Sequence, residues 1–539
     1  MKFLTHILIA GLIAITVTGC KKLDLEPTDR FSESNFWTVD ANVYSALNNN
    51  YGLMYTSMMF FYNESTSDNA YSTTGDYALI ASGNANASQA QFLNDWKYYY
   101  STIKSCNVFL ANVDQNKTLP AATISRLKAE NRFIRAFAHF NLTKWYGDVP
   151  LIDKDITAEE AKTIARSPKA TVIKFVTDEL EAAAAALPAK EAIPASENGR
   201  ISKGAAIALE ARVLLYEGNR MADVITLCER LIREGGTNGQ YSLVNNYSDL
   251  FSNPTVNRTN NEVILSLQYV PSVRTWSEFF DFAPRSVGGR VSGMAPTQEL
   301  VDDYITLNGR GISETGSGYI ETNPYINRDP RLTATVVYDK FNWVRPDGTV
   351  KVIYIKPGTD PDASRLDEYS AASQASSPTG YYWRKYFDPI ALTSFASGTN
   401  LHLLRYAEVL LTYAEAKQSL GQLDETVWNN TIRLLRQRAG FTDAAALSFP
   451  GTANLTTIIH RERRSELAME GLRTDDLRRW KIAETVLNGY AHGAKFGDPA
   501  IDNGYIRAQR RTFTEKDYLW PIPSSEIGLN GNLTQNRGY

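Results

Sequence analysis

Apolar residues recur at alternating spacings of three and four along several long stretches, and this spacing predicts amphipathic helices. In residues 92–113, one such face carries Trp96, Tyr99, Ile103, Cys106, Leu110 and Val113. We therefore expect Trp96 to pack in the core rather than in a ligand site. The same periodicity predicts further helices over residues 38–59, 121–146 and 171–187.

Two further pairs of predicted helices share one pattern. The first pair flanks Gly218 and the second flanks Gly421, and in each pair an alanine (Ala211 or Ala414) lies seven residues before the glycine. Glycine permits the turn, and hairpins of this kind bury their faces by stacking on neighbours, as in tetratricopeptide-like proteins. We predict a mainly α fold with a helix-hairpin scaffold assembled from both ends of the chain. The predicted pairs are residues 203–217 with 221–233, and residues 401–420 with 424–438.

The stretch between these pairs, residues 234–400, lacks sustained helical periodicity and is dense in Gly, Pro, Asn and Ser. We predict a large irregular insertion that contains short strands at residues 263–269, 333–338 and 350–355. Residues 60–90 break the periodicity in the same way. Connecting segments carried by a rigid scaffold are where binding residues usually lie.

Charge is densest in residues 461–480, where eleven of twenty residues are charged and apolar residues are interleaved with them. Gly471 interrupts a first helix, and Thr474 followed by two aspartates predicts the start of a second helix. We interpret the segment as a structural helix hairpin with ion pairs at its joint. Spacings of three and four place opposite charges on adjacent turns, which predicts pairing of Glu466 with Arg463, Glu470 with Arg473, and Asp475 with Arg478 and Arg479.

The N-terminus has the pattern of an export signal. Lys2 precedes an apolar run over residues 7–17, which is too short to span a bilayer of about 30 Å, and small residues then precede Cys20 in T-V-T-G-C. We predict a signal peptide over residues 1–19, lipidation of the Cys20 thiol and a tether to residue 37. Acyl chains would anchor the protein, because each buried CH₂ contributes about 0.8 kcal/mol. The alternative is a plain secretory leader with an incidental cysteine.

Composition narrows the function classes. The chain of 539 residues is 43% hydrophobic and 21% charged, which is typical of a globular protein with a large core, and its formal charge of −3 does not favour nucleic acid binding.

Cys106 and Cys228 lie on apolar helical faces, so we predict buried free thiols, although an exported protein could also pair them. No cysteine or histidine spacing predicts a metal site, and no cofactor is expected.

Catalytic motifs are missing from the sequence. It contains no HExxH, GxSxG or Walker loop, and no GxGxxG followed by a helix. The four histidines after the leader are not at ligand spacing, and we expect packed or surface imidazoles rather than catalysts at His139, His402, His460 and His492. We therefore expect a binding protein rather than an enzyme.

Two segments without periodicity combine aromatic and polar residues. Residues 60–77 carry Asp68, Asn69 and Tyr71, and residues 269–290 carry Trp276 and Phe280. Flat aromatic faces beside amide and carboxylate groups suit an uncharged oligosaccharide. Each of these aromatic rings could instead pack against the scaffold.

Four segments, in order along the chain, resemble the SusD/RagB family of outer-membrane nutrient-binding lipoproteins. The pattern E-R-x-x-E-L-x-x-E-G-x-R-x-x-D-L-x-R-W in residues 461–480 resembles the C-terminal signature of that family. The leader (residues 1–20), residues 132–151 (RFIRAFAHFNLTKWYGDVPL) and residues 518–539 (YLWPIPSSEIGLNGNLTQNRGY) also match it. The resemblance spans essentially the whole chain.

The resemblance implies one SusD-like domain over residues 38–539. We expect a helical scaffold (38–233 and 401–490), a ligand-binding insertion (234–400) and a C-terminal tail (491–539).

The resemblance also implies a function. It predicts a lipid-anchored protein on the cell surface of the outer membrane that binds oligosaccharide and delivers it, as a lid, to a SusC-like TonB-dependent barrel. It favours Tyr71 and Trp276 as stacking platforms, with Asp68 and Asn69 as hydrogen-bonding partners. Peptide as the cargo, or an unrelated helical-repeat protein that scaffolds the envelope, are the alternatives.

Overall fold

The computed structural model describes residues 33–539 except 234–235, 291, 363, 372–375, 389 and 392–393. The predicted signal peptide, Cys20 and most of the predicted tether lie outside the described residues.

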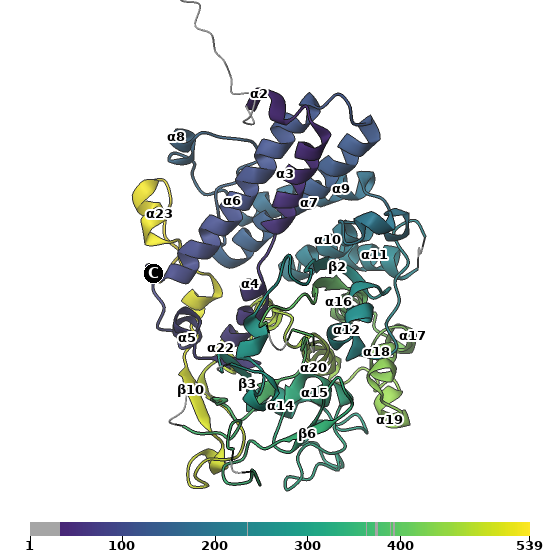
Figure 1. The fold of residues 1–539 in the computed structure, drawn as a ribbon, viewed down its shortest axis with the longest axis vertical. Coiled ribbons are helices and arrows are strands. Elements are labelled where there is room, and N and C mark those ends of the chain that lie inside the picture. The colour runs from purple at the N-terminus through teal and green to yellow at the C-terminus, as the bar shows by residue number, and fades with distance from the viewer. Residues whose placement is uncertain are drawn as a thin grey trace, which may run out of the picture.

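A frame of helices forms one half of the molecule (Figure 1). Its N-terminal part contains α3 (Asp40–Gly52), α6 (Ala90–Asn112), α7 (Ala121–Tyr146) and α9 (Lys169–Ala186). It continues into α10 (Lys203–Glu217) and α11 (Met221–Ile232), against which α16 (Tyr406–Ser419) packs from the C-terminal half. The predicted mainly α scaffold built from both ends of the chain is confirmed.

The α10–α11 hairpin shows how local sequence sets the helix ends. The side chain of Ser202 accepts a hydrogen bond from the backbone N–H of Ala205, which caps the first turn of α10. Gly218 ends this helix in the left-handed conformation at φ 74°, which a residue without Cβ adopts at little cost. This hairpin therefore forms where the sequence predicts it.

Three predicted helices are wrong in part. The helix predicted over residues 38–59 ends at Gly52, and α4 (Ser57–Tyr62) begins after Thr56, whose hydroxyl accepts from the backbone N–H of Met59 at 3.1 Å. The helix predicted over residues 401–420 begins with a strand, β8 (Leu401–Arg405), which pairs antiparallel with β2 (Val263–Leu267). All five residues of β8 are buried, and periodicity cannot distinguish such a short apolar run from a buried helix. The last predicted helix divides into α17 (Glu425–Asn429) and α18 (Ile432–Ala439).

The insertion contains short strands and single helical turns, and it occupies the lower half of the view in Figure 1. The described strands form two-stranded antiparallel sheets. The strand predicted over residues 333–338 shrinks to β4, because α15 occupies the first half of that range and begins with a proline at its first turn. Besides β2 and β8, the strands are β1 (Ala70–Ser72), β3 (Met294–Pro296), β4 (Val336–Val337), β5 (Phe341–Val344), β6 (Val350–Ile353), β7 (Tyr382–Trp383), β9 (Gly489–His492) and β10 (Arg507–Arg511).

Other α-helices, most of them short, connect these parts. They are α2 (Glu33–Phe36), α5 (Gly75–Ala81), α8 (Ala158–Ala161), α12 (Asp249–Ser252), α13 (Pro254–Arg258), α14 (Gln298–Asp303), α15 (Pro330–Thr335), α19 (Ala444–Leu447), α20 (Leu455–Leu467), α21 (Arg473–Arg479), α22 (Ala483–Val486) and α23 (Ser524–Leu529).

The core extends through the frame and into the insertion. Trp96 is buried, as its position on the apolar face of α6 predicts. Cys106 and Cys228 are both buried and free, which agrees with the prediction of free thiols.

The charged segment forms the expected helix hairpin of α20 and α21, but most of its charges pair with distant residues. The carboxylate of Glu466 is fully buried and accepts from Arg405 at 2.6 Å, from Arg331 at 3.0 Å and from Arg438. Glu470 accepts from Arg405 and from Lys385. The predicted pairs along the helix surface are therefore wrong, because these carboxylates point into the core, where only long-range partners reach them.

Two smaller corrections concern the same hairpin. Asp475 pairs with Lys144 of α7 at 2.8 Å rather than with a neighbouring arginine. Helix α21 begins at Arg473 without a side-chain cap, and the hydroxyl of Thr474 donates instead to the carbonyl oxygen of Asn63 at 2.7 Å. Both contacts attach the hairpin to the N-terminal half of the chain.

We predict that Glu466→Gln lowers the free energy of unfolding by about 3–5 kcal/mol. The substitution removes the carboxylate charge that the buried guanidinium groups share, and leaves those groups unpaired. Urea unfolding followed by circular dichroism measures this change. Glu181→Gln, at an exposed position of α9, is the matched control and should change the free energy by no more than about 0.5 kcal/mol. Equal stability of the two variants would show that the Glu466 cluster does not hold the fold together.

Candidate ligand-binding surface

The two aromatic-polar segments meet through contacts between aromatic rings, near a short sheet that joins the first segment to residues 294–296. β1 pairs antiparallel with β3, which places Tyr71 opposite Ala295 and Ser72 opposite Met294. Beside this sheet, the rings of Phe61 and Trp276 lie 5.0 Å apart between their centroids. A segment from the N-terminal half and a segment from the insertion therefore form one surface region.

Asp68 lies at the base of this region rather than on its surface. Its carboxylate accepts from Arg473 Nε at 2.8 Å and Nη2 at 3.0 Å, and it lies 2.9 Å from Arg464 Nη2. Burial alone would raise the pKa of Asp68, but the two guanidinium groups hold it well below its usual value. The carboxylate is thus ionised and saturated by the α20–α21 hairpin.

Asn69 is held by the same hairpin. Its amide Nδ2 donates to Glu64 Oε2 at 2.8 Å, and its Oδ1 accepts from Arg464 Nε at 2.7 Å. Burial raises the pKa of Glu64 to about 7, although the hydrogen bonds from Asn69 and from the backbone N–H of Gly471 oppose this shift. Asn69 is 1% exposed and bonded through both amide atoms, so it fixes the loop rather than facing a ligand.

Trp276 and Phe280 are also part of the packing. The Trp276 side chain is 4% exposed, and its Nε1 donates to the carbonyl oxygen of Thr399 at 2.7 Å. Phe280 is 1% exposed and meets the ring of Phe395 edge-on at 5.2 Å. A sugar ring stacks only on an accessible aromatic face, so the structure does not support the expected platform role of Trp276. The composition of the segment alone could not show whether the rings of Trp276 and Phe280 are buried or exposed.

Tyr71 differs from the other four residues. Its neighbours in β1, Ala70 and Ser72, are buried, while Tyr71 is partly exposed because alternate residues of a strand point to opposite faces. Partial burial raises the pKa of its hydroxyl. Tyr71 therefore keeps the accessible surface that a ligand contact requires, and its platform role stays a prediction.

A second accessible group lies on the insertion side and was not singled out from the sequence. Arg290 forms a double hydrogen bond with Asp281, at 3.0 Å for each pair of atoms, and its guanidinium carbon lies 5.4 Å from the ring centroid of Phe395. The Phe395 side chain is 38% exposed. The backbone joins this group to β1, because Ser72 and Thr73 both donate to the carbonyl oxygen of Gly293, and Gly293 donates to that of Asp281. No periodicity marks Phe395 in the sequence.

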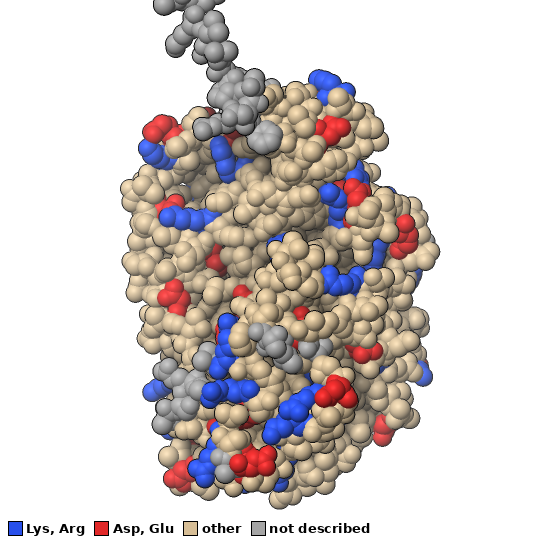
Figure 2. Space-filling model, viewed as in Figure 1, with Lys and Arg blue, Asp and Glu red and all other residues tan. Residues whose placement is uncertain are grey.

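We define the loop surface as Tyr71, Asp281, Arg290 and Phe395. It combines two accessible rings with a planar cation and a carboxylate, which is the chemistry that stacking and hydrogen bonding of a polar ligand need. On the face shown in Figure 2, basic and acidic side chains are interspersed without one large patch of a single sign. The face drawn therefore carries no extended field of one sign.

Among the residues that the structure describes, no helix combines the length and apolar character needed to cross a bilayer. Three or more His, Cys, Asp or Glu side chains do not come together there in an arrangement that could hold a metal ion.

We predict that Asp68→Asn acts on stability, because it leaves Arg464 and Arg473 without their buried carboxylate, at a cost of about 3–5 kcal/mol. The lowered pKa also gives this contribution a pH dependence. It is present above the unfolded pKa of about 3.9 and is lost as the pH falls through the folded value. Thermal melts of the unmodified chain and of Asp68→Asn from pH 7 to pH 3 measure the difference in stability between them, which should narrow toward acid pH. A difference that does not change with pH would contradict the assigned pairing.

Two protein-family models match the chain. The model described as the SusD family matches residues 240–539, and the model described as "Starch-binding associating with outer membrane" matches residues 23–215. These matches contain both parts of the loop surface, since Tyr71 lies in the second range and Arg290 in the first.

Individual proteins show the same similarity. SusD-like protein P2 of Formosa agariphila is 25% identical over 98% of this chain and 98% of its own length. The starch-binding protein SusD of Bacteroides thetaiotaomicron is 25% identical over 81% of this chain and 76% of its own. The crystal structure of a SusD-like carbohydrate-binding protein from Bacteroides fragilis superposes with a TM-score of 0.83 at 30% identity, covering 93% of this chain and 100% of that one.

Proposed function

The chain belongs to the SusD family, and from this premise we propose that it is a non-catalytic lipoprotein that binds oligosaccharides at the outer surface of the outer membrane. It delivers them to a SusC-like TonB-dependent barrel, over which it acts as a lid. The domain organisation that we propose keeps the boundaries expected from the sequence.

The loop surface is the observation that carries the proposal for a glycan. Tyr71 and Phe395 offer ring faces, and Arg290 and Asp281 offer a donor and an acceptor beside them. The relative from B. thetaiotaomicron is named for starch binding and the similar structure from B. fragilis for carbohydrate binding, and these names support a glycan as the ligand class.

Three of the four histidines after the leader, His139, His402 and His460, support binding rather than catalysis. His139 and His402 are fully enclosed, and burial lowers the pKa of each ring, to about 3 and about 4. His460 stacks on Trp480 at 3.4 Å, and burial lowers its pKa to about 4. Such rings stay neutral near pH 7 and do not serve as general acids there.

Capture is expected to depend on the loop surface. Isothermal titration of the purified protein against panels of glycans and peptides should identify a glycan that saturates, and Tyr71→Ala and Phe395→Ala should each weaken its binding by about tenfold. Tyr354→Ala is the control, because this partly buried ring lies after β6, outside both loops.

The outcome of that titration separates the candidate functions. Glycan affinity that survives both substitutions would place the ligand elsewhere on the chain. Saturable binding of peptides alone would favour a peptide importer of the same family. A lack of ligand for both the protein and its complex with the barrel would favour an envelope scaffold.

The anchor is tested separately. We expect Cys20→Ala to move the protein from the membrane fraction into the soluble fraction, since the acyl chains attach through that thiol. Fractionation of cells that express each form, followed by immunoblotting, gives the readout. A Cys20→Ala protein that stays with the outer membrane would contradict lipid anchoring at this residue.

A further inference from the structure

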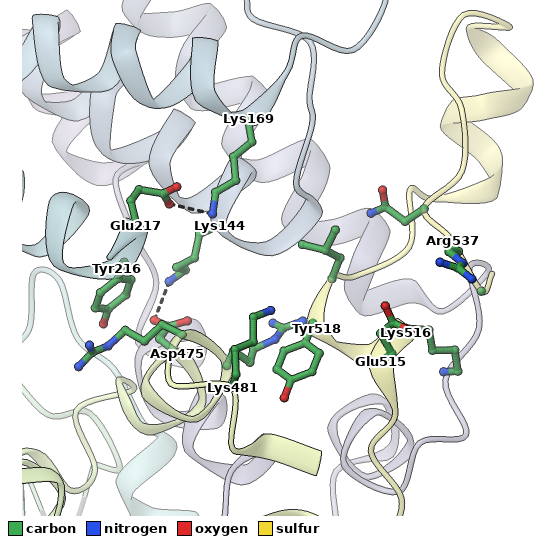
Figure 3. A pocket seen from close by; sticks show the side chains of 15 residues that line it. Lys144, Lys169, Tyr216, Glu217, Asp475, Lys481, Glu515, Lys516, Tyr518 and Arg537 are labelled. Carbon is green, nitrogen blue, oxygen red and sulfur yellow. Dashed lines mark hydrogen bonds and ion pairs between the residues drawn. The ribbon is translucent and has the colours of Figure 1, made fainter. Parts of the chain in front are cut away.

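A polar cavity of about 620 Å³ lies between the ends of the frame helices and the C-terminal segment (Figure 3). Its volume falls within the range of small-molecule sites. It shares no residue with the loop surface. Its walls come from α7, α9, α10 and α21, and from residues 481, 515, 516, 518, 519 and 536–538.

Cations outnumber acids in the lining of the cavity. Figure 3 shows two of the cations paired inside it, Lys144 with Asp475 and Lys169 with Glu217, each at 2.8 Å. Three others, Arg478, Lys481 and Arg537, form no ion pair with any described residue, and the latter two are exposed. Glu515 is the acid of the lining that likewise has no described ion pair, and it is also exposed. The cavity therefore holds positive charge that the described chain does not neutralise.

Arg478 is the buried member of these three, with 9% of its side chain exposed. Its Nη2 donates to the carbonyl oxygen of Asp517 at 2.7 Å, and its guanidinium carbon lies 4.6 Å from the Trp145 ring centroid. Its Nε and Nη1 have no hydrogen-bond partner among the described residues. Leaving a charged donor buried without a hydrogen-bond partner is unfavourable. The stacking and the one hydrogen bond hold this group in place, so its free N–H groups are fixed donors.

Two unpaired oxygens accompany these donors. Asp475 Oδ1 is buried and has no partner, while the other oxygen of this carboxylate accepts from Lys144. The Tyr216 hydroxyl, which also lines the cavity, is buried and unpaired. The residues of the lining thus hold buried cationic donors without a partner, one buried acceptor that lacks an incoming O–H or N–H, and one buried hydroxyl that can act in either role.

We propose that this cavity binds a small hydroxylated acid, of which a sugar acid is the representative class. An anionic oxygen of the ligand accepts from Arg478, with Lys481 and Arg537 adding charge at the mouth, and a ligand hydroxyl donates to Asp475. A sulfate ion lacks the hydroxyl donor, and a neutral sugar lacks the anion. The inference does not depend on the proposed function, because the two sites have no residue in common.

Isothermal titration of the full chain with glucuronate and galacturonate tests the proposal, with glucose, galactose and sulfate as comparison ligands. We expect one uronate to bind with 1:1 stoichiometry and at least about tenfold more tightly than its neutral sugar or sulfate. Arg478→Gln should weaken uronate binding by about tenfold or more, and Arg537→Gln by a smaller factor of about threefold. Arg345→Gln is the matched control, since this arginine is exposed and lies outside the cavity.

Folding of the variants is checked by circular dichroism. Because Arg478 also packs on Trp145, Arg537→Gln and Lys481→Gln decide the matter if Arg478→Gln does not fold. Neutral sugars or sulfate that bind as tightly as the uronates would overturn the proposal, as would absence of uronate binding up to about 10 mM. Unchanged affinity in the cavity variants would overturn it as well. Tyr71→Ala should leave uronate affinity unchanged, so failure here and failure of glycan capture at the loop surface are distinguishable.

Discussion

The rest of the structure depends on the buried charges of the α20–α21 hairpin. Glu466 contacts Arg331 of the insertion, Arg405 at the end of β8, and Arg438 of α18, while Arg464 and Arg473 hold Asp68 of the N-terminal half. A buried carboxylate is stable only with its full set of partners, because an unpaired charge in the core costs several kcal/mol. The hairpin therefore fixes, at one place, segments that are hundreds of residues apart in the sequence.

This constraint decides which surface can receive a ligand. The loop that carries Asp68 and Asn69 is attached from beneath by arginines, and Trp276 is attached through its ring nitrogen, so these side chains support the surface. Tyr71 faces outward because its strand neighbours face the core. Arg290 and Phe395 complete an accessible region on the insertion side. A rigid support of this kind lets loops vary at their outer face while the frame stays the same.

Local pattern predicted much of the helical frame. The bounds of α7 agree with the apolar periodicity at both ends, and Gly218 marks the end of α10 as expected. β8 could not be predicted as a strand, because a short apolar run buried on all sides carries no period. The prediction of ion pairs within the hairpin was wrong for a related reason. Sequence spacing shows which charges can meet on one helix, but not that Glu466 points into the core toward Arg331 and Arg405.

The candidate site was predictable in location and not in detail. The two aromatic-polar segments do meet, through the packing of Phe61 against Trp276. Whether one aromatic ring in such a segment is exposed depends on partners elsewhere in the chain, as Thr399 shows for Trp276.

The central claim is that the α20–α21 hairpin fixes the N-terminal loop, and native-state hydrogen exchange of the unmodified chain, read by mass spectrometry, measures it most directly. If the hairpin fixes the N-terminal loop, amides of residues 63–70 and 462–476 should exchange at similar slow rates and lose protection together in urea. Fast exchange of residues 63–70 while residues 462–476 stay protected would contradict it.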